Sequence, residues 1–259
     1  MALPKEKESI VTAFVLDFET GGLSAQKSAA TQLAVHAVRI DTFEVIGTYN
    51  MYFRPYNYKP LEKPERKVLR TKQELQDEQD KMMEYTDRAL EVSGITMSML
   101  ENRGVDLKTG CEELIAFIVK NTLSTKRSDM PFIVGQNIQF DLGFLTQIML
   151  YTGLWNEFCK VVRGNKDYWG NFQPYYVDTI IFCQLALGHI KNMPSWKLEV
   201  EAEWLGVDLD DAHDADADVT ATREILRLLT ARMRNTETGD GFNLLADNKK
   251  QKTREHFKI

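Results

Sequence analysis

The chain has 259 residues, of which 43% are hydrophobic and 27% are charged, as expected for a globular protein with a substantial core. No stretch approaches the roughly 20 continuous apolar residues that a membrane-spanning helix needs. The N-terminus lacks the apolar segment of a secretory signal. Cys111, Cys159 and Cys183 are far apart and show no zinc-ligand spacing. We therefore expect no membrane association and a reducing, cytoplasmic setting.

The net charge of −6 is concentrated in one part of the chain. Nine acids lie between Leu198 and Thr222, a stretch that contains no Lys or Arg. The rest of the chain has 32 bases and 29 acids and is net positive, at +3. A dense group of carboxylates often needs a bound cation, so the charge pattern does not exclude nucleic acid as a partner.

The first part of the chain predicts three strands. Residues 10–16 are a continuous apolar run rich in β-branched side chains, which is typical of a buried strand. Residues 31–40 and 43–53 predict two more strands, with a turn near Asp41 and Thr42. The short connections indicate an antiparallel meander.

The rest of the chain predicts helices and one further strand. A short buried strand is expected at residues 131–134. Helical spacing of apolar residues recurs in five segments, which are 111–121, 141–151, 177–187, 197–205 and 218–233. Strands followed by alternating helices and a strand predict an α/β fold in which helices cover a mixed sheet.

Two internal segments resemble insertions, within a single domain that we expect to span residues 1–235. Residues 57–91 are charged, with bases first and acids after. They could form a helical arm over a site, a contact with a second copy, or a solvated excursion, and charge runs favour the last. Residues 151–176 are rich in aromatic rings with interleaved bases; such rings either pack under a long loop or stack on nucleobases. We expect residues 236–259 to be a C-terminal extension.

A pair of acids, Asp17 and Glu19, follows the first predicted strand. Side chains alternate along a strand, so both carboxylates point to the same face. Their repulsion should raise one pKa unless a cation lies between them, and oxygen ligands suit Mg²⁺ or Mn²⁺. An acid pair that simply meets solvent is the alternative. Gly21 and Gly22 come next and would allow a tight turn or a close approach of ligand to backbone.

A second acid, Asp141, lies where the strand at 131–134 has given way to a helix. The positive end of the helix dipole favours a carboxylate there, so an ordinary first-turn acid is the alternative. Asn137 is a candidate either to cap the turn or to line a site.

The third segment contains His213 and Asp218 at the start of the last predicted helix. Part of its acidity fits an ordinary helix N-terminus. A calcium loop would need Gly and Glu where the chain has Val219 and Ile225, so we reject that interpretation. His213 precedes the helix on a loop with several acids nearby, and histidine is the side chain that ordinarily changes charge near neutral pH.

Together, these segments resemble the DEDDh, or DnaQ-like, family of 3′→5′ exonucleases. The order is a DxE pair on the first strand, an Asp at a mid-chain helix, and HxAxxD at a late helix. The resemblance covers roughly residues 10–232. It implies a ribonuclease H-like mixed sheet, with the first three strands antiparallel and later ones parallel, flanked by helices. The family often has His where this chain has Gln136, and Thr where it has Gly21.

The resemblance also implies roles for individual residues. Asp17 would bridge two divalent metal ions, Mg²⁺ or Mn²⁺. Glu19 and Asp218 would complete one metal site, Asp141 would hold the second ion, and His213 would be the general base. The substrate's terminal nucleotide would face a backbone segment and one side chain, namely Thr20, Gly21, Gly22, Leu23 and Asn137.

The implied substrate is a single-stranded 3′ end of nucleic acid, with DNA favoured and nucleoside 5′-monophosphates as products. An exoribonuclease similar to RNase T or oligoribonuclease is the first alternative. A catalytically vestigial module that binds nucleic acid or a polymerase is the second. Because the chain shows no attached polymerase, any proofreading or repair role would require a separate partner.

Overall fold

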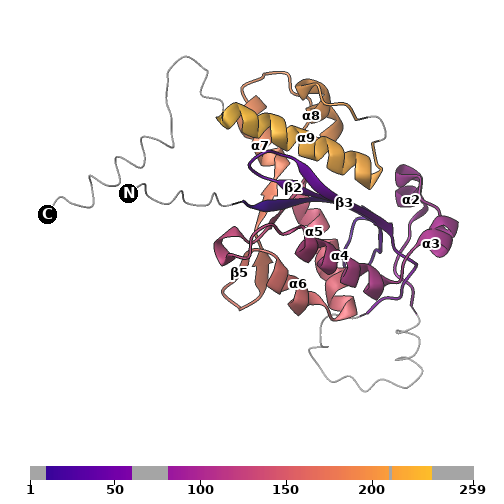
Figure 1. Ribbon diagram of the computed structural model, residues 1–259. Helices are drawn as coiled ribbons and strands as arrows, with labels where there is room; N and C mark the ends of the chain where they lie inside the picture. The colour runs from indigo at the N-terminus through magenta and orange to yellow at the C-terminus, as the bar shows by residue number, and fades with distance from the viewer. Residues whose placement is uncertain (1–9, 60–80, 210–211, 235–259) are drawn as a thin grey trace, which may run out of the picture.

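The computed structural model describes residues 10–59, 81–209 and 212–234 (Figure 1). The strands are β1 (Thr12–Thr20), β2 (Ala30–Arg39), β3 (Val45–Tyr52), β4 (Phe132–Gly135), β5 (Gly164–Lys166), β6 (Phe172–Pro174) and β7 (Tyr176–Asp178). The helices are α2 (Asp87–Ser93), α3 (Met97–Arg103), α4 (Leu107–Asn121), α5 (Ile138–Thr152), α6 (Trp155–Val161), α7 (Thr179–Leu187), α8 (Leu198–Leu205) and α9 (Ala215–Arg234), with a short 3₁₀ turn at Arg127–Asp129.

Five strands form one mixed sheet in the order β3-β2-β1-β4-β7. The pairs β1–β2 and β2–β3 are antiparallel, whereas β4 and β7 join in parallel. The predicted sheet, with three antiparallel strands followed by parallel ones, is therefore confirmed. A separate two-stranded hairpin is formed by β5 and β6.

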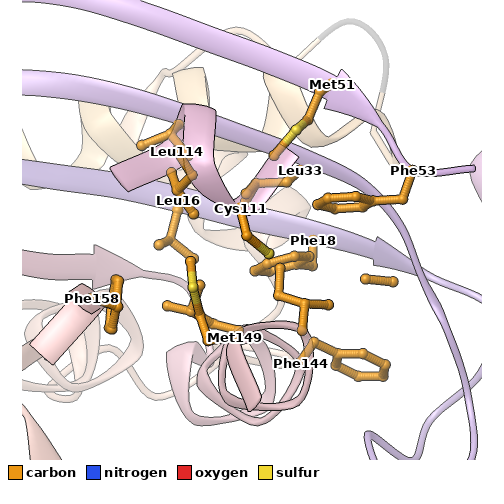
Figure 2. Packing of buried hydrophobic residues seen from close by; sticks show 14 of the residues in the cluster. Leu16, Phe18, Leu33, Met51, Phe53, Cys111, Leu114, Phe144, Met149 and Phe158 are labelled. Carbon is orange, nitrogen blue, oxygen red and sulfur yellow. The ribbon is translucent and has the colours of Figure 1, made fainter. Parts of the chain in front are cut away.

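Helices cover both faces of the sheet. On one face, α4 and α5 pack over residues of the first three strands, as Figure 2 shows for Leu16, Leu33 and Met51 beside Leu114 and Met149. On the other face lies α9, whose apolar side contacts β1 and β2. Helices α7 and α8 pack beside α9 in a smaller cluster (Figure 1). The parallel strand β4 is thus covered on both faces, whereas β7 at the edge of the sheet is partly exposed.

Strand β1 is longer than its apolar run predicts. It continues through Asp17 and Glu19 to Thr20, because Phe18 between them is buried and the pairing with β2 persists to that end. The alternation places Phe18 in the core and both acids on the opposite face.

Other boundaries also shift. Helix α5 begins at Ile138 rather than 141, and α9 begins at Ala215 rather than 218. The segment predicted as a helix at 177–187 begins as strand β7 before α7 starts. Helices α2, α3 and α6 are short, and the periodicity did not predict them. Seven-residue helices offer too few turns for a periodic signal.

The predicted insertions have different outcomes. The centre of the charged segment at 57–91 lies outside the described residues, as does the C-terminal extension, 236–259. The described part of that segment from Glu84 onward contacts the end of β1, where Thr86 donates from its backbone N–H and its Oγ1 to the carbonyl of Gly21. None of the helices in the described ranges has the length and apolar character that crossing a membrane requires.

Candidate active site

Three carboxylates meet at the end of β1. Asp17 and Glu19 come from β1 and Asp218 comes from the first turn of α9, and their oxygen atoms lie within 4.8 Å of one another. The sequence separates Asp218 from the pair by about two hundred positions, and the packing of α9 on the sheet brings them together.

Asp141 lies next to this group, on the first turn of α5. It is only 3% exposed, and its Oδ1 accepts a hydrogen bond of 3.0 Å from the backbone N–H of Phe18. That bond ties α5 to β1 at the residue between the two strand acids. The structure therefore brings together all four predicted carboxylates.

The acids are held in a setting that opposes ionisation. Burial raises the pKa of Asp17 to about 8, and the charges of Asp218 and Asp214 add to the effect. Burial and the charge of Asp17 raise the pKa of Glu19 to about 9. Burial also raises the pKa of Asp141 well above its usual range. Clustered carboxylates of this kind favour protons or metal cations as partners.

These residues fit divalent metal ions. All donors are oxygen atoms, which suits Mg²⁺ and Mn²⁺. Oδ1 of Asp218 is buried and has no hydrogen-bond partner among the described residues, so it is free to act as a ligand. An unpaired buried carboxylate oxygen is costly, and a cation would remove that cost.

His213 faces the same cavity from the turn before α9. Its backbone is left-handed, with φ of 74°, and half of its side chain is exposed. Its Nε2 atom lies 3.7 Å from Oε1 of Glu199 on α8. The imidazole is therefore both accessible to a substrate and close to a carboxylate that can orient it.

The start of α9 is fixed to the sheet by two contacts. Gln32 on β2 donates to Oδ2 of Asp214 at 3.2 Å, and Nε2 of His36 lies 3.1 Å from Oδ1 of Asp216. Asp214 also caps the helix, since its Oδ1 accepts from the backbone N–H of Asp216. The acids next to Asp218 thus orient the helix, in agreement with the expected N-terminal role.

The segment after β1 forms part of the cavity wall. Thr20 is 9% exposed and donates from Oγ1 to the Gly22 carbonyl at 2.8 Å. Leu23 is 91% exposed at the cavity wall. Gly21 is not among the lining residues: its N–H donates to Ala29, and a Cβ there would lie 2.4 Å from the Glu84 carbonyl oxygen. Close packing against the 84–85 backbone accounts for this glycine.

A buried polar network holds the connection between β1 and β2 in place. The Nε2 atom of Gln147 on α5 donates to the carbonyls of Ala25 and Ser28, the latter at 2.9 Å. Its Oε1 accepts from the hydroxyl of Tyr56 at 2.7 Å, and that hydroxyl accepts from the N–H of Ala30. This network fixes the path of the chain between β1 and β2.

Asn137 and Gln136 line the cavity between β4 and α5. Asn137 is left-handed, with φ of 51°, and its side chain makes no capping bond to α5, so within the described part of the chain its amide can meet a ligand in the cavity. Gln136 donates to the carbonyl of Trp196 at 3.1 Å and accepts from Thr179. Gln136, where the family often has His, thus anchors residues 196–199, which form one wall of the cavity.

The four carboxylates, His213, Glu199, Gln136, Asn137 and the segment of Thr20, Gly22 and Leu23 line one cavity of about 1110 Å³. The sequence did not indicate several of its lining residues, namely Thr86, Arg88, Phe140, Ile180, Trp196, Lys197 and Glu199. Arg88 lies in the charged segment 57–91, for which the solvated interpretation was favoured, and Lys197 lies immediately before α8. Because these two bases are far apart in the sequence, nothing in it indicated that they line the same cavity.

Comparisons with known proteins find similarity to a DNA polymerase and to an exonuclease. No family model matches the chain. Among curated proteins, a PolC-type DNA polymerase III of Thermotoga petrophila is 28% identical over 212 residues, which are 81% of this chain and 11% of the polymerase. Exonuclease I of Escherichia coli, solved with a dT13 oligonucleotide, superposes with a TM-score of 0.58 at 20% identity.

The chain has the fold of exonuclease I. The likeness covers 86% of this chain and 42% of the exonuclease I chain. A zinc-bound complex of that enzyme with single-stranded DNA gives a TM-score of 0.60 at 21% identity. The predicted ribonuclease H-like fold, and with it the resemblance to DnaQ-like exonucleases at the level of the fold, is therefore confirmed. The chain spans less than half of each of these relatives.

Proposed function

We propose that this chain is a divalent-metal-dependent 3′→5′ exonuclease that acts on single-stranded DNA. One observation carries the proposal: three carboxylates lie within 4.8 Å of one another, with Asp141 and His213 lining the same cavity, in the fold of exonuclease I. A fold alone does not define an activity, but a fold with this constellation supports one.

Four residues, Asp17, Glu19, Asp141 and Asp218, would hold the metal ions. When bound, two divalent cations would stabilise the attacking and leaving oxygens of an in-line phosphoryl displacement. His213 would take the proton from the attacking water, for which its half-exposed ring is accessible. Glu199, 3.7 Å from Nε2, would stabilise the imidazolium that results.

The cavity wall would position the 3′ end. Arg88 and Lys197 are the Lys and Arg side chains among its described lining residues, and they would attract the substrate's phosphates. The apolar side chain of Leu23, exposed at the wall, would contact the terminal base. The backbone of Thr20, Gly22 and Leu23, together with Asn137, would border the same nucleotide. Gly21 would act only by holding this segment against the 84–85 backbone. A terminus must leave its stack to enter such a site, which favours single strands.

The test is digestion of matched DNA and RNA oligonucleotides labelled at the 5′ end, with Mg²⁺, with Mn²⁺ and with chelator. We expect stepwise shortening from the 3′ end, release of nucleoside 5′-monophosphates, and no reaction with chelator. A preference for RNA would assign the exoribonuclease function instead. Binding of the DNA without any degradation in either metal would contradict the enzyme proposal.

A partner is also part of the proposal. A solved complex of exonuclease I with SSB-Ct and the PolC-type relative both concern proteins of DNA metabolism. We infer that this chain works beside a polymerase or a single-strand-binding protein in the same compartment as DNA. Copurification of either protein from native cells would test that inference.

A further inference from the structure

The aromatic segment at 151–176 divides into a packed half and an exposed half. Trp155, Phe158 and Phe172 pack in or against the main core, with the rings of Trp155 and Phe158 stacked at 5.7 Å. Tyr168 and Trp169 are 93% and 80% exposed at the tip of the β5–β6 hairpin. Packing under a loop therefore explains only the first half.

The exposed tip is held in a defined shape. The carboxylate of Asp167 accepts from the backbone N–H groups of Trp169 at 2.9 Å and of Asn171 at 2.8 Å. Gly170 supplies the left-handed residue of the turn, with φ of 85°. The Tyr168 and Trp169 rings meet edge to face, 5.7 Å apart. The hairpin thus exposes two large rings on a turn of defined shape. The Asp167 carboxylate accepts hydrogen bonds from the backbone of that turn.

At the base of the hairpin is a groove of about 500 Å³. Its lining includes the base Arg163, the amides of Asn165 and Gln173, and the rings of Tyr175 and Tyr176. The guanidinium of Arg163 lies 5.2 Å from the ring centre of Tyr175. Neither Arg163 nor the nearby Lys166 forms an ion pair within the described part of the chain. Exposed rings beside unpaired bases and amides are the features that bind single-stranded nucleic acid.

The groove is linked to the active-site cavity along β7. The hydroxyl of Tyr176 in the groove accepts a hydrogen bond of 2.7 Å from Gln139, in the first turn of α5. At the other end of β7, Oδ1 of Asp178 accepts from the N–H of Asn137 at 3.2 Å, a cavity residue. Three strand residues span roughly 10 Å. Figure 1 shows strand β5 of the hairpin and helix α2, which carries the cavity residue Arg88, at different sides of the view. Since the groove and the active-site cavity lie at the two ends of β7, a single strand must extend beyond the nucleotides held in the cavity to reach both.

We propose that the β5–β6 hairpin and its groove form a second binding site for the same single strand, upstream of the 3′ end held in the active site. This inference rests on the proposed function, which places the 3′ end in the main cavity. Bases stack on Trp169, Tyr168 and the groove tyrosines, and Arg163 and Lys166 meet the phosphates. The site would favour long single strands over short ones without reading their sequence.

The test compares a long oligo(dT) of about 20 nucleotides with a short one of about 3 nucleotides, a length below usual single-strand sites. Binding is measured by fluorescence anisotropy in chelator, and KM is measured in Mn²⁺. We expect the wild-type chain to prefer the long strand. Trp169→Ala should reduce the long-to-short ratio of affinities by about fivefold or more, the usual effect of one lost stacking ring.

Matched variants separate stacking from a general loss of structure. Trp169→Phe keeps a ring and should retain most of the preference, whereas Arg163→Gln should lower it and reduce its salt dependence. Trp204→Ala removes a tryptophan on α8 that is 44% exposed and lines neither cavity, and should keep the wild-type ratio. Thermal unfolding of each variant verifies that it is folded.

The outcomes distinguish the two proposals. A wild-type chain that degrades no oligonucleotide but binds the long one through Trp169 would overturn the exonuclease assignment and leave this site standing. Degradation with the same length preference in the wild type, Trp169→Ala and Arg163→Gln would overturn this site alone. An equal loss in Trp169→Ala and Trp204→Ala would also overturn it.

Discussion

Replacement of Asp17 by Asn should abolish activity and at the same time stabilise the metal-free protein. Burial and the Asp218 and Asp214 carboxylates raise the Asp17 pKa from 3.8 to about 8. Between these pH values the folded chain keeps a proton that the unfolded chain has lost. The free energy of unfolding therefore falls as the pH rises through this window.

The size of the effect follows from the shift. At pH 7, about 3 pH units above the ordinary Asp pKa, the loss in the free energy of unfolding approaches about 4 kcal/mol, at 1.36 kcal/mol per pH unit. Because the neighbouring acids titrate together with Asp17, we assign about half, or about 2 kcal/mol, to this residue. Asn has nearly the same shape and no charge, so it removes that cost. A chain of this size should then melt about 4–8 °C higher.

Differential scanning calorimetry in chelator measures this gain. At pH 5 the gain should shrink to less than about 1 kcal/mol, since most of the window lies above that pH. Mn²⁺ should raise the melting temperature of the wild type and have little effect on Asp17→Asn. Asp106→Asn is the control, because Asp106 caps α4 away from the site and Asn caps a helix equally well. A variant that melts at or below the wild type at pH 7 in chelator would refute the reasoning.

Three further predictions concern other residues. His213→Asn should lower kcat by about 10²–10⁴-fold while Mn²⁺ binding by calorimetry stays near the wild-type value; unchanged turnover would remove it as the base. Gln147→Leu removes the acceptor of the Tyr56 O–H and the donor to the Ala25 and Ser28 carbonyls, and should destabilise the chain by about 3 kcal/mol in urea unfolding. Burial raises the pKa of Glu201 from 4.5 to about 7, so stability falls as the pH rises through that window. Glu201→Gln should stabilise the chain by about 2 kcal/mol at pH 8 and little at pH 5, and an equal effect at both values would count against this assignment.

The sequence by itself determined the elements whose signal is local. The apolar run before Asp17 predicts a buried strand, and its alternation places Asp17 and Glu19 on one face, as the structure has them. The long apolar face of residues 218–233 likewise predicted the last helix, α9. The motif order around Asp141, His213 and Asp218 indicated the fold through a family resemblance.

Only the tertiary structure decided which residues complete the site. Glu199 approaches His213 because α8 and α9 pack together, and Arg88 enters the cavity because the chain around Thr86 pairs with Gly21. No periodicity encodes such contacts, since they depend on the relative placement of elements far apart in sequence. The aromatic segment 151–176 shows the same limit. The sequence shows which residues are aromatic but not which of them are buried, and only the packing of the hairpin places Trp155 against the core and Trp169 in solvent.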